Sequence, residues 1–164
     1  MKQFIFIMSL LALIGCKEEK RQETSAQNDA SEAHTDATHE QHQKADATVY
    51  KNSWTADIQL DNDKKWQANM ETNEGVEKMK NILKTHNTSA IEDYHQLAEQ
   101  LNNVKNDVVK KCNMKGPSHD NLHVWLVPLI EKIEALSETE NSEDAAKIKH
   151  SIVENVNLYS NYFR

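Results

Sequence analysis

The sequence predicts an all-α fold, an antiparallel up-down-up-down four-helix bundle preceded by a signal peptide and a disordered tether. Three observations lead to this prediction. The 164-residue chain contains only three glycines and two prolines, too few for the many turns of a β-sandwich or barrel. Apolar residues are concentrated in the first 15 residues and in residues 53–164. Within 53–164 they recur every three or four residues along four segments with short polar connections.

Residues 1–15 are typical of a secretory signal peptide. The apolar run is shorter than the about 20 residues that a membrane-spanning helix needs. It ends in Leu13-Ile14-Gly15-Cys16, which resembles the lipobox of bacterial lipoproteins. The resemblance implies that Cys16 is lipidated, with palmitate or a similar acyl chain, and anchors the mature protein to a membrane. An ordinary secretory signal followed by a coincidental cysteine is the alternative.

Residues 16–52 are expected to consist of the lipidated Cys16 and a disordered tether. No large apolar side chain occurs between residues 17 and 48, so burial cannot offset the entropy of ordering this segment. Lys17-Glu18-Glu19 resembles the surface-export signal of Bacteroidetes-type lipoproteins. We therefore expect a cell-envelope location, either periplasm-facing or surface-exposed on the outer membrane. The tether histidines His34, His39 and His42 are candidates for loose metal capture.

The folded block, residues 53–164, is expected to begin with a strap and a first helix. Apolar and polar residues alternate from Trp54 to Leu60, which favours an extended strap lying on the bundle. The first helix is expected to start at one of residues 61–63, to include Trp66 and to be weakened at Gly75. Its apolar stripe consists of Trp66, Met70, Val76, Met79, Ile82 and Leu83.

Three more helices follow from their stripes and their boundary residues. Ser89-Ala90-Ile91-Glu92 predicts a capping box at the start of the second helix. Pro117 suits the first turn of the third helix, which Pro128 should kink, and Ser142 opens the fourth. The three stripes run through Ile91, Tyr94, Leu97, Leu101, Val104, Val108 and Cys112; through Leu122, Trp125, Leu126, Leu129, Ile130, Ile133 and Leu136; and through Ala145, Ile148, Ile152, Val156, Tyr159 and Phe163.

Soft and nitrogen ligands gather at one end of this predicted bundle. Cys112, Met114, His119 and His123 surround the turn between the second and third helices, and Met70 on the first helix faces the same end. Residues four apart project from one helix face, so the two histidines can bind one ion. Thiolate and thioether favour Cu(I), whereas imidazole suits copper or zinc. We predict a copper or zinc site here. In the alternative interpretation, Cys112 and Met70 belong to the core and the two histidines bind no metal ion.

Two resemblances extend this interpretation. The predicted architecture resembles small exported bundles of the cytochrome b562 type, which implies heme b. The fourth helix lacks the histidine of that pattern and ends in Tyr159, Asn161 and Tyr162, so heme is less favoured than copper or zinc. The stretch from Cys112 to His123 is similar to a segment of uncharacterised Bacteroidetes-type lipoproteins, which carry no established activity.

The net charge and the absence of catalytic motifs reduce the number of function classes to consider. The net charge of −7 without a basic cluster argues against nucleic acid as a partner. No catalytic motif stands out, so the sequence does not predict an enzyme. We predict a lipid-anchored cell-envelope protein that binds copper or zinc at one end of a helical bundle. The alternative is a cofactor-free lipoprotein interaction module that docks an envelope protein.

Overall fold

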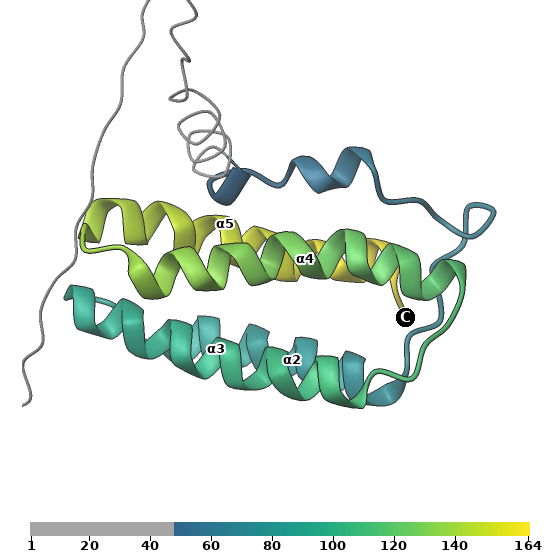
Figure 1. Cartoon of the computed structure of the whole chain (residues 1–164), viewed down its shortest axis with the longest axis horizontal. Coiled ribbons are helices and arrows are strands. Elements are labelled where there is room, and N and C mark those ends of the chain that lie inside the picture. The colour runs from purple at the N-terminus through teal and green to yellow at the C-terminus, as the bar shows by residue number, and fades with distance from the viewer. Residues whose placement is uncertain (1–47) are drawn as a thin grey trace, which may run out of the picture. The chain divides into compact units, whose positions relative to one another are not determined.

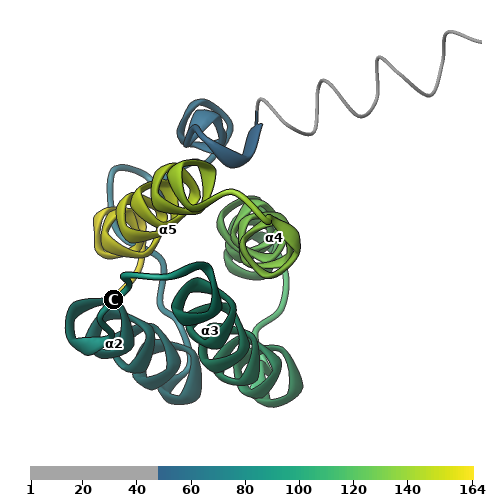
Figure 2. The ribbon, with the colours of Figure 1, turned by 90° about the vertical axis from the view of Figure 1, so that its left-hand side faces the viewer.

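The computed structural model describes residues 48–164, which form a four-helix bundle (Figure 1). The predicted signal peptide, Cys16 and the tether up to residue 47 lie outside the described residues. Successive helices are in contact, and α2 also contacts α5, which closes the bundle (Figure 2). The predicted all-α, up-down-up-down fold is confirmed. The elements are η1 (Ser53–Ala56), α2 (Met70–Thr85), α3 (Ile91–Lys111), α4 (Pro117–Glu138) and α5 (Ser142–Tyr162). None of the helices in residues 48–164 is long and apolar enough to cross a membrane.

The first helix of the bundle begins later than predicted. Asp61 and Lys64 exchange two backbone hydrogen bonds of 2.9 Å around a tight turn. Within it, Asn62 and Asp63 have φ values of 48° and 66°, in the left-handed region that Asn and Asp tolerate better than most residues. A helix cannot pass through this backbone, so α2 starts at Met70. The predicted start at residues 61–63 is wrong because these polar residues form a turn.

Trp66 belongs to an extended segment rather than to a helix. Its backbone N–H donates to the Tyr162 carbonyl at 2.8 Å, and its own carbonyl accepts from the N–H of Arg164 at 3.0 Å. These bonds form an isolated parallel bridge between Trp66 and Phe163. The segment that enters α2 is therefore tied to the C-terminal residues of the chain.

The start of α3 differs from the predicted capping box. Ala90 occupies the N-cap position, and the carboxylate of Asp93 accepts from the backbone N–H groups of Ser89 at 2.8 Å and Ala90 at 2.9 Å. These bonds lower the pKa of Asp93. The return half of a capping box is thus made by Asp93, not by Glu92. The predicted starts of α4 at Pro117 and of α5 at Ser142 are confirmed.

Gly75 marks a close approach of two helices. A Cβ atom at this position would lie 2.2 Å from Val108 Cγ2 on α3, inside van der Waals contact. The helix continues through Gly75 to Thr85, so the predicted weak point is instead a packing point. Pro128 likewise lies inside α4, which continues to Glu138. The largest fully buried apolar side chains are Val76, Met79, Leu97, Leu101, Val108, Leu122, Trp125, Leu129, Leu136, Ile152 and Val156.

Residues 48–69, here called the strap, lie on the bundle. The strap expected from Trp54 to Leu60 is part of this longer segment, but it is not an alternating strand. Trp54 and Ile58 are buried whereas Ala56 and Leu60 are exposed, because η1 turns the chain between them. The strap starts beside the α4–α5 turn, where Val49 packs near Thr139 and Ile148. It reaches the opposite end of α4, where the N–H of Gln59 donates to Asn121 Oδ1 at 2.8 Å. The strap thus runs antiparallel to α4 (Figure 1).

Candidate functional site

The turn between α3 and α4 places the predicted ligands at one end of the bundle. Cys112 is the C-cap of α3, and its N–H donates to the Val108 carbonyl at 2.9 Å. Gly116, with φ 62°, reverses the chain, and Pro117 starts α4 with its fixed φ. Thus His119 lies in the first turn of α4 and His123 one turn later.

The two histidines lie side by side. Their ring centroids are 4.4 Å apart and their planes are tilted by 52°. The spacing follows from helix geometry, since residues four apart are neighbours on one face. His119 is half-buried and His123 is exposed, so the pair is open to solvent on one side.

Cys112 faces the core instead. It is half-buried and packs against the buried apolar cluster, and it is the one free thiol among residues 48–164. Burial raises the pKa of Tyr159 well above its usual range, and the nearby Cys112 acts in the same direction. The Tyr159 hydroxyl donates to Asn73 Oδ1 at 2.8 Å. Cys112 therefore belongs to the surroundings of Tyr159.

The two methionines among the predicted ligands, Met114 and Met70, also differ in burial. Met114 is half-buried against the core, whereas the side chain of Met70 is 68% exposed at the start of α2. Across the described part of the chain, no three His, Cys, Asp or Glu side chains are grouped so that they could hold a metal ion. The structure brings His119 and His123 together but does not group them with Cys112 as a three-ligand site.

A buried lysine is a feature that sequence reasoning missed. Lys132 on α4 is fully buried, and its ammonium donates to Asn155 Oδ1 on α5 at 3.0 Å and to Asn52 Oδ1 on the strap at 2.5 Å. Trp54 Nε1 donates to the same Asn52 oxygen at 3.0 Å. The signal was present, since Lys132 and Asn155 both fall on apolar stripes where polar residues need a partner.

The surroundings of Lys132 explain why its pKa is lowered. Burial lowers the pKa of Lys132 to about 8, while the charges of Glu131 and Glu154 act in the opposite direction. Asn52 Nδ2 donates to the Ser151 carbonyl and to Glu154, each at 3.2 Å. Lys132 thus links α4, α5 and the strap through one buried polar cluster.

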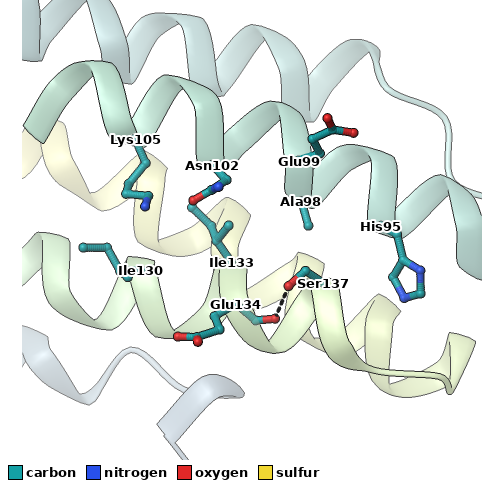
Figure 3. Close-up of a pocket in the computed structure, with 9 residues that line it drawn as sticks. All are labelled: His95, Ala98, Glu99, Asn102, Lys105, Ile130, Ile133, Glu134 and Ser137. Carbon is teal, nitrogen blue, oxygen red and sulfur yellow. Dashed lines mark hydrogen bonds between the residues drawn. The ribbon is translucent and has the colours of Figure 1, made fainter. Parts of the chain in front are cut away.

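A groove of about 450 Å³ runs between α3 and α4 (Figure 3). Asn102 and Ile133 lie at its middle, and the charged side chains of Glu99, Lys105 and Glu134 lie around them (Figure 3). His95 at one end is held by a 2.8 Å hydrogen bond between Nε2 and the Thr139 carbonyl. The groove is lined by His95, Ala98, Glu99, Asn102, Lys105, Ile130, Ile133, Glu134 and Ser137.

Three features therefore stand out in residues 48–164: the histidine pair, the buried lysine cluster and the α3–α4 groove. Of these, the histidine pair contains the ligands expected for a metal, and the lysine cluster has Lys132 and Asn155 fully buried beneath the strap. No protein-family model, curated protein or solved structure matches this chain.

Proposed function

We propose that this chain is a lipid-anchored cell-envelope protein that binds a copper or zinc ion through His119 and His123. The separation of 4.4 Å between their ring centroids carries the proposal. Metal–nitrogen bonds are about 2.0–2.1 Å long, so two imidazoles this close can reach one ion after small ring rotations. Imidazole is a common ligand of both metals.

Such a site is open, which favours exchange over permanent retention. Two imidazoles occupy two of the about four positions that zinc uses, and water or a ligand from another molecule takes the others. His123 is exposed, so a partner can approach the ion directly. This geometry suits a protein that receives and passes on metal in the envelope, with the tether histidines as weak additional ligands.

Metal titration tests the histidine pair. Isothermal titration of the mature chain with zinc, and with Cu(I) under anaerobic conditions, compares wild type with His119→Ala, His123→Ala and Cys112→Ala. Each histidine variant should bind at least about tenfold more weakly, and Cys112→Ala should bind like wild type. His150→Ala is the control, because His150 is exposed on α5 and contacts Glu154 at 3.3 Å. The tether histidines add the same background to every variant.

Equal metal affinity in all these variants would refute the site. It would favour the alternative function, a cofactor-free interaction module.

The anchor is tested separately by Cys16→Ser, which should move the protein from the membrane fraction to the soluble fraction of exporting bacteria. A Cys112→Ser variant is the control, and it should stay with the membranes.

A further inference from the structure

The histidine pair supplies only part of the coordination that a zinc ion needs. Protein-bound zinc takes four ligands at the corners of a tetrahedron, and His119 and His123 provide two of them. Across residues 48–164, no three His, Cys, Asp or Glu side chains are grouped so that they could share an ion. Two positions are therefore left for water or for ligands from another molecule, and the exposed His123 makes the ion accessible to one.

The geometry of the ion suits a second, identical pair. Because His119 and His123 are separated by about 6 Å along α4, the plane through an ion and the two coordinating nitrogens runs along the helix axis. In a tetrahedron, the plane of the other two ligands is perpendicular to the first. A second copy, related by a two-fold axis through the ion, presents its own two imidazoles in that perpendicular plane. The two α4 helices then cross at about a right angle.

Exposed apolar side chains flank the pair. Val127 lies one turn beyond His123 on α4 and is 47% exposed, and Val109 on α3 is 52% exposed. Val109 and His123 are equally far from the middle of the α3–α4 turn, as are Asn102 and Ile130, which both line the α3–α4 groove. Val109 is therefore level with His123. A molecule that approaches the ion covers these two valines as well.

The charges at this end of the bundle do not oppose the approach of a second copy. Within four residues of either histidine, the chain carries one base, Lys115, and one acid, Asp120. Over all the elements that meet at this end, acids and bases are equal in number, so two such ends carry no net repulsion. The bases are Lys64, Lys65, Lys105, Lys110, Lys111, Lys115 and Arg164, and the acids are Asp57, Asp61, Asp63, Glu71, Glu74, Asp107 and Asp120.

The acids of the α3–α4 groove lie away from this contact. Glu134 is 13 residues from the middle of the histidine pair, which is about 20 Å along α4. Between two copies whose α4 helices cross at a right angle, the Glu134 side chains are about 28 Å apart, well beyond the about 8–10 Å over which salt screens charges. Glu99 lies at nearly the same level on α3 and is equally remote.

We propose that two copies of this chain share one zinc ion, each contributing His119 and His123, so that four imidazoles surround the metal. This inference rests on the proposed metal site and names the partner that completes it. Zinc–nitrogen bonds hold the two copies together, so the pairing needs no large buried surface. Because half of the ligands belong to another molecule, the shared site forms and separates with the zinc supply. When zinc is in excess, each chain keeps its own ion and water replaces the second pair.

Sedimentation velocity at different zinc concentrations tests the sharing. The mature chain carries Cys16→Ser, so that neither an acyl chain nor this thiol takes part. It should be monomeric in EDTA, dimeric with about one zinc ion per two chains, and monomeric again in a large excess of zinc. His119→Ala and His123→Ala should each reduce the dimer fraction at least about tenfold, because each copy loses one of its two ligands. His150→Ala removes an exposed histidine of α5 and is the matched control, which should dimerise like wild type.

A second variant separates the histidine pair from the tether. His34→Ala/His39→Ala/His42→Ala removes the tether histidines, and zinc should still pair this chain. A dimer that is lost in this variant would assign the other two ligands to the tether and overturn the proposal. So would a dimer that persists in His119→Ala and His123→Ala.

Isothermal titration distinguishes failure of the sharing from failure of the metal site. The stoichiometry should be about one zinc ion per two chains. One ion per monomeric chain, with an affinity that depends on His119 and His123, would overturn the sharing and leave the proposed metal site intact. An affinity that depends on neither histidine would refute both. Each variant should keep the wild-type melting temperature in EDTA within about 3 °C, and one that does not is replaced by His119→Gln or His123→Gln.

Discussion

At the residue scale, Lys132 shows how a buried charge can be tolerated between helices. The lysine and its two partners come from three separate parts of the chain: α4 carries Lys132, α5 supplies Asn155 and the strap supplies Asn52. A buried ammonium is costly unless hydrogen bonds replace its hydration. The low pKa of Lys132 reflects the part of that cost that the two amide oxygens do not recover.

The pH dependence of stability should report this residue. The folded-state pKa of Lys132 is about 8, below the ordinary value of 10.5, so the unfolded chain binds more protons between these values. The free energy of unfolding should therefore rise as pH increases from 8 to 10.5, by up to about 3 kcal/mol from this group. Urea denaturation across this range should show the rise in wild type and lose it in Lys132→Met. Parallel pH profiles for the two proteins would contradict the assignment.

Lys132 could be located from the sequence only in part. Its position on an apolar stripe predicts burial, but its partner Asn52 lies 80 residues away in a segment assigned to the tether. No local pattern links residues so far apart. The histidine pair is the opposite case, because a spacing of four on one helix fixes their proximity without any tertiary information. Cys112 was ambiguous, since one residue can continue a core stripe and also end a helix.

At the element scale, helix contacts depend on residues whose role is decided by their neighbours. Gly75 is read as a helix weakness when α2 is considered alone. Its meaning changes when α3 is present, because the missing side chain makes room for Val108. The same ambiguity affected Asp61 to Asp63, since Asp and Asn are favoured both at helix N-caps and in turns. The stripes themselves predicted the helices well because they depend on spacing only.

Substitution of Gly75 should test the packing point. Gly75→Ala places a Cβ atom against Val108, and overpacking of this kind costs about 1–3 kcal/mol, more than the about 1 kcal/mol that alanine gains as a helix former. Urea denaturation should show lower stability for Gly75→Ala than for wild type. Combining it with Val108→Ala should cost less than the sum of the two single substitutions. Simple additivity would mean that the two side chains do not meet.

The strap should contribute substantially to stability. Trp54 is buried and its ring packs edge-on against Tyr162, with 5.8 Å between the centroids. Trp54→Ala should lower the free energy of unfolding by about 3–5 kcal/mol. Leu60→Ala on the same strap is the control, and it should cost less than about 1 kcal/mol because Leu60 is 40% exposed. Similar losses in both variants would argue against a packed strap.

At the scale of the whole molecule, the strap and the helices share one core. The strap contributes buried side chains, shares the Lys132 cluster and pairs with the last residues of the chain. A fold of this size with a shared core is expected to unfold in a single transition.

Two spectroscopic probes can check this cooperativity. Fluorescence reports Trp54 and Trp66 on the strap together with Trp125 in the core, whereas far-ultraviolet circular dichroism reports the helices. Their urea transitions should coincide. If fluorescence changes at a lower urea concentration than helicity, the strap leaves the bundle first, and Lys132 is then exposed before global unfolding. The midpoint in Lys132→Met would distinguish these cases, because it should shift only the transition that includes the strap.

The direction of the strap determines where the chain reaches the bundle relative to the histidine pair. A four-helix bundle entered directly through its first helix would receive the chain at the end that holds α2's start and α5's finish, beside His119 and His123. The strap instead admits the chain near Ala135, about 20 Å along α4 from the histidine pair at 1.5 Å per residue. Residue 48, where the described chain begins, therefore lies away from the end that carries the imidazoles. The strap itself leads the chain along α4 to that end, where Gln59 contacts Asn121, two residues from each histidine.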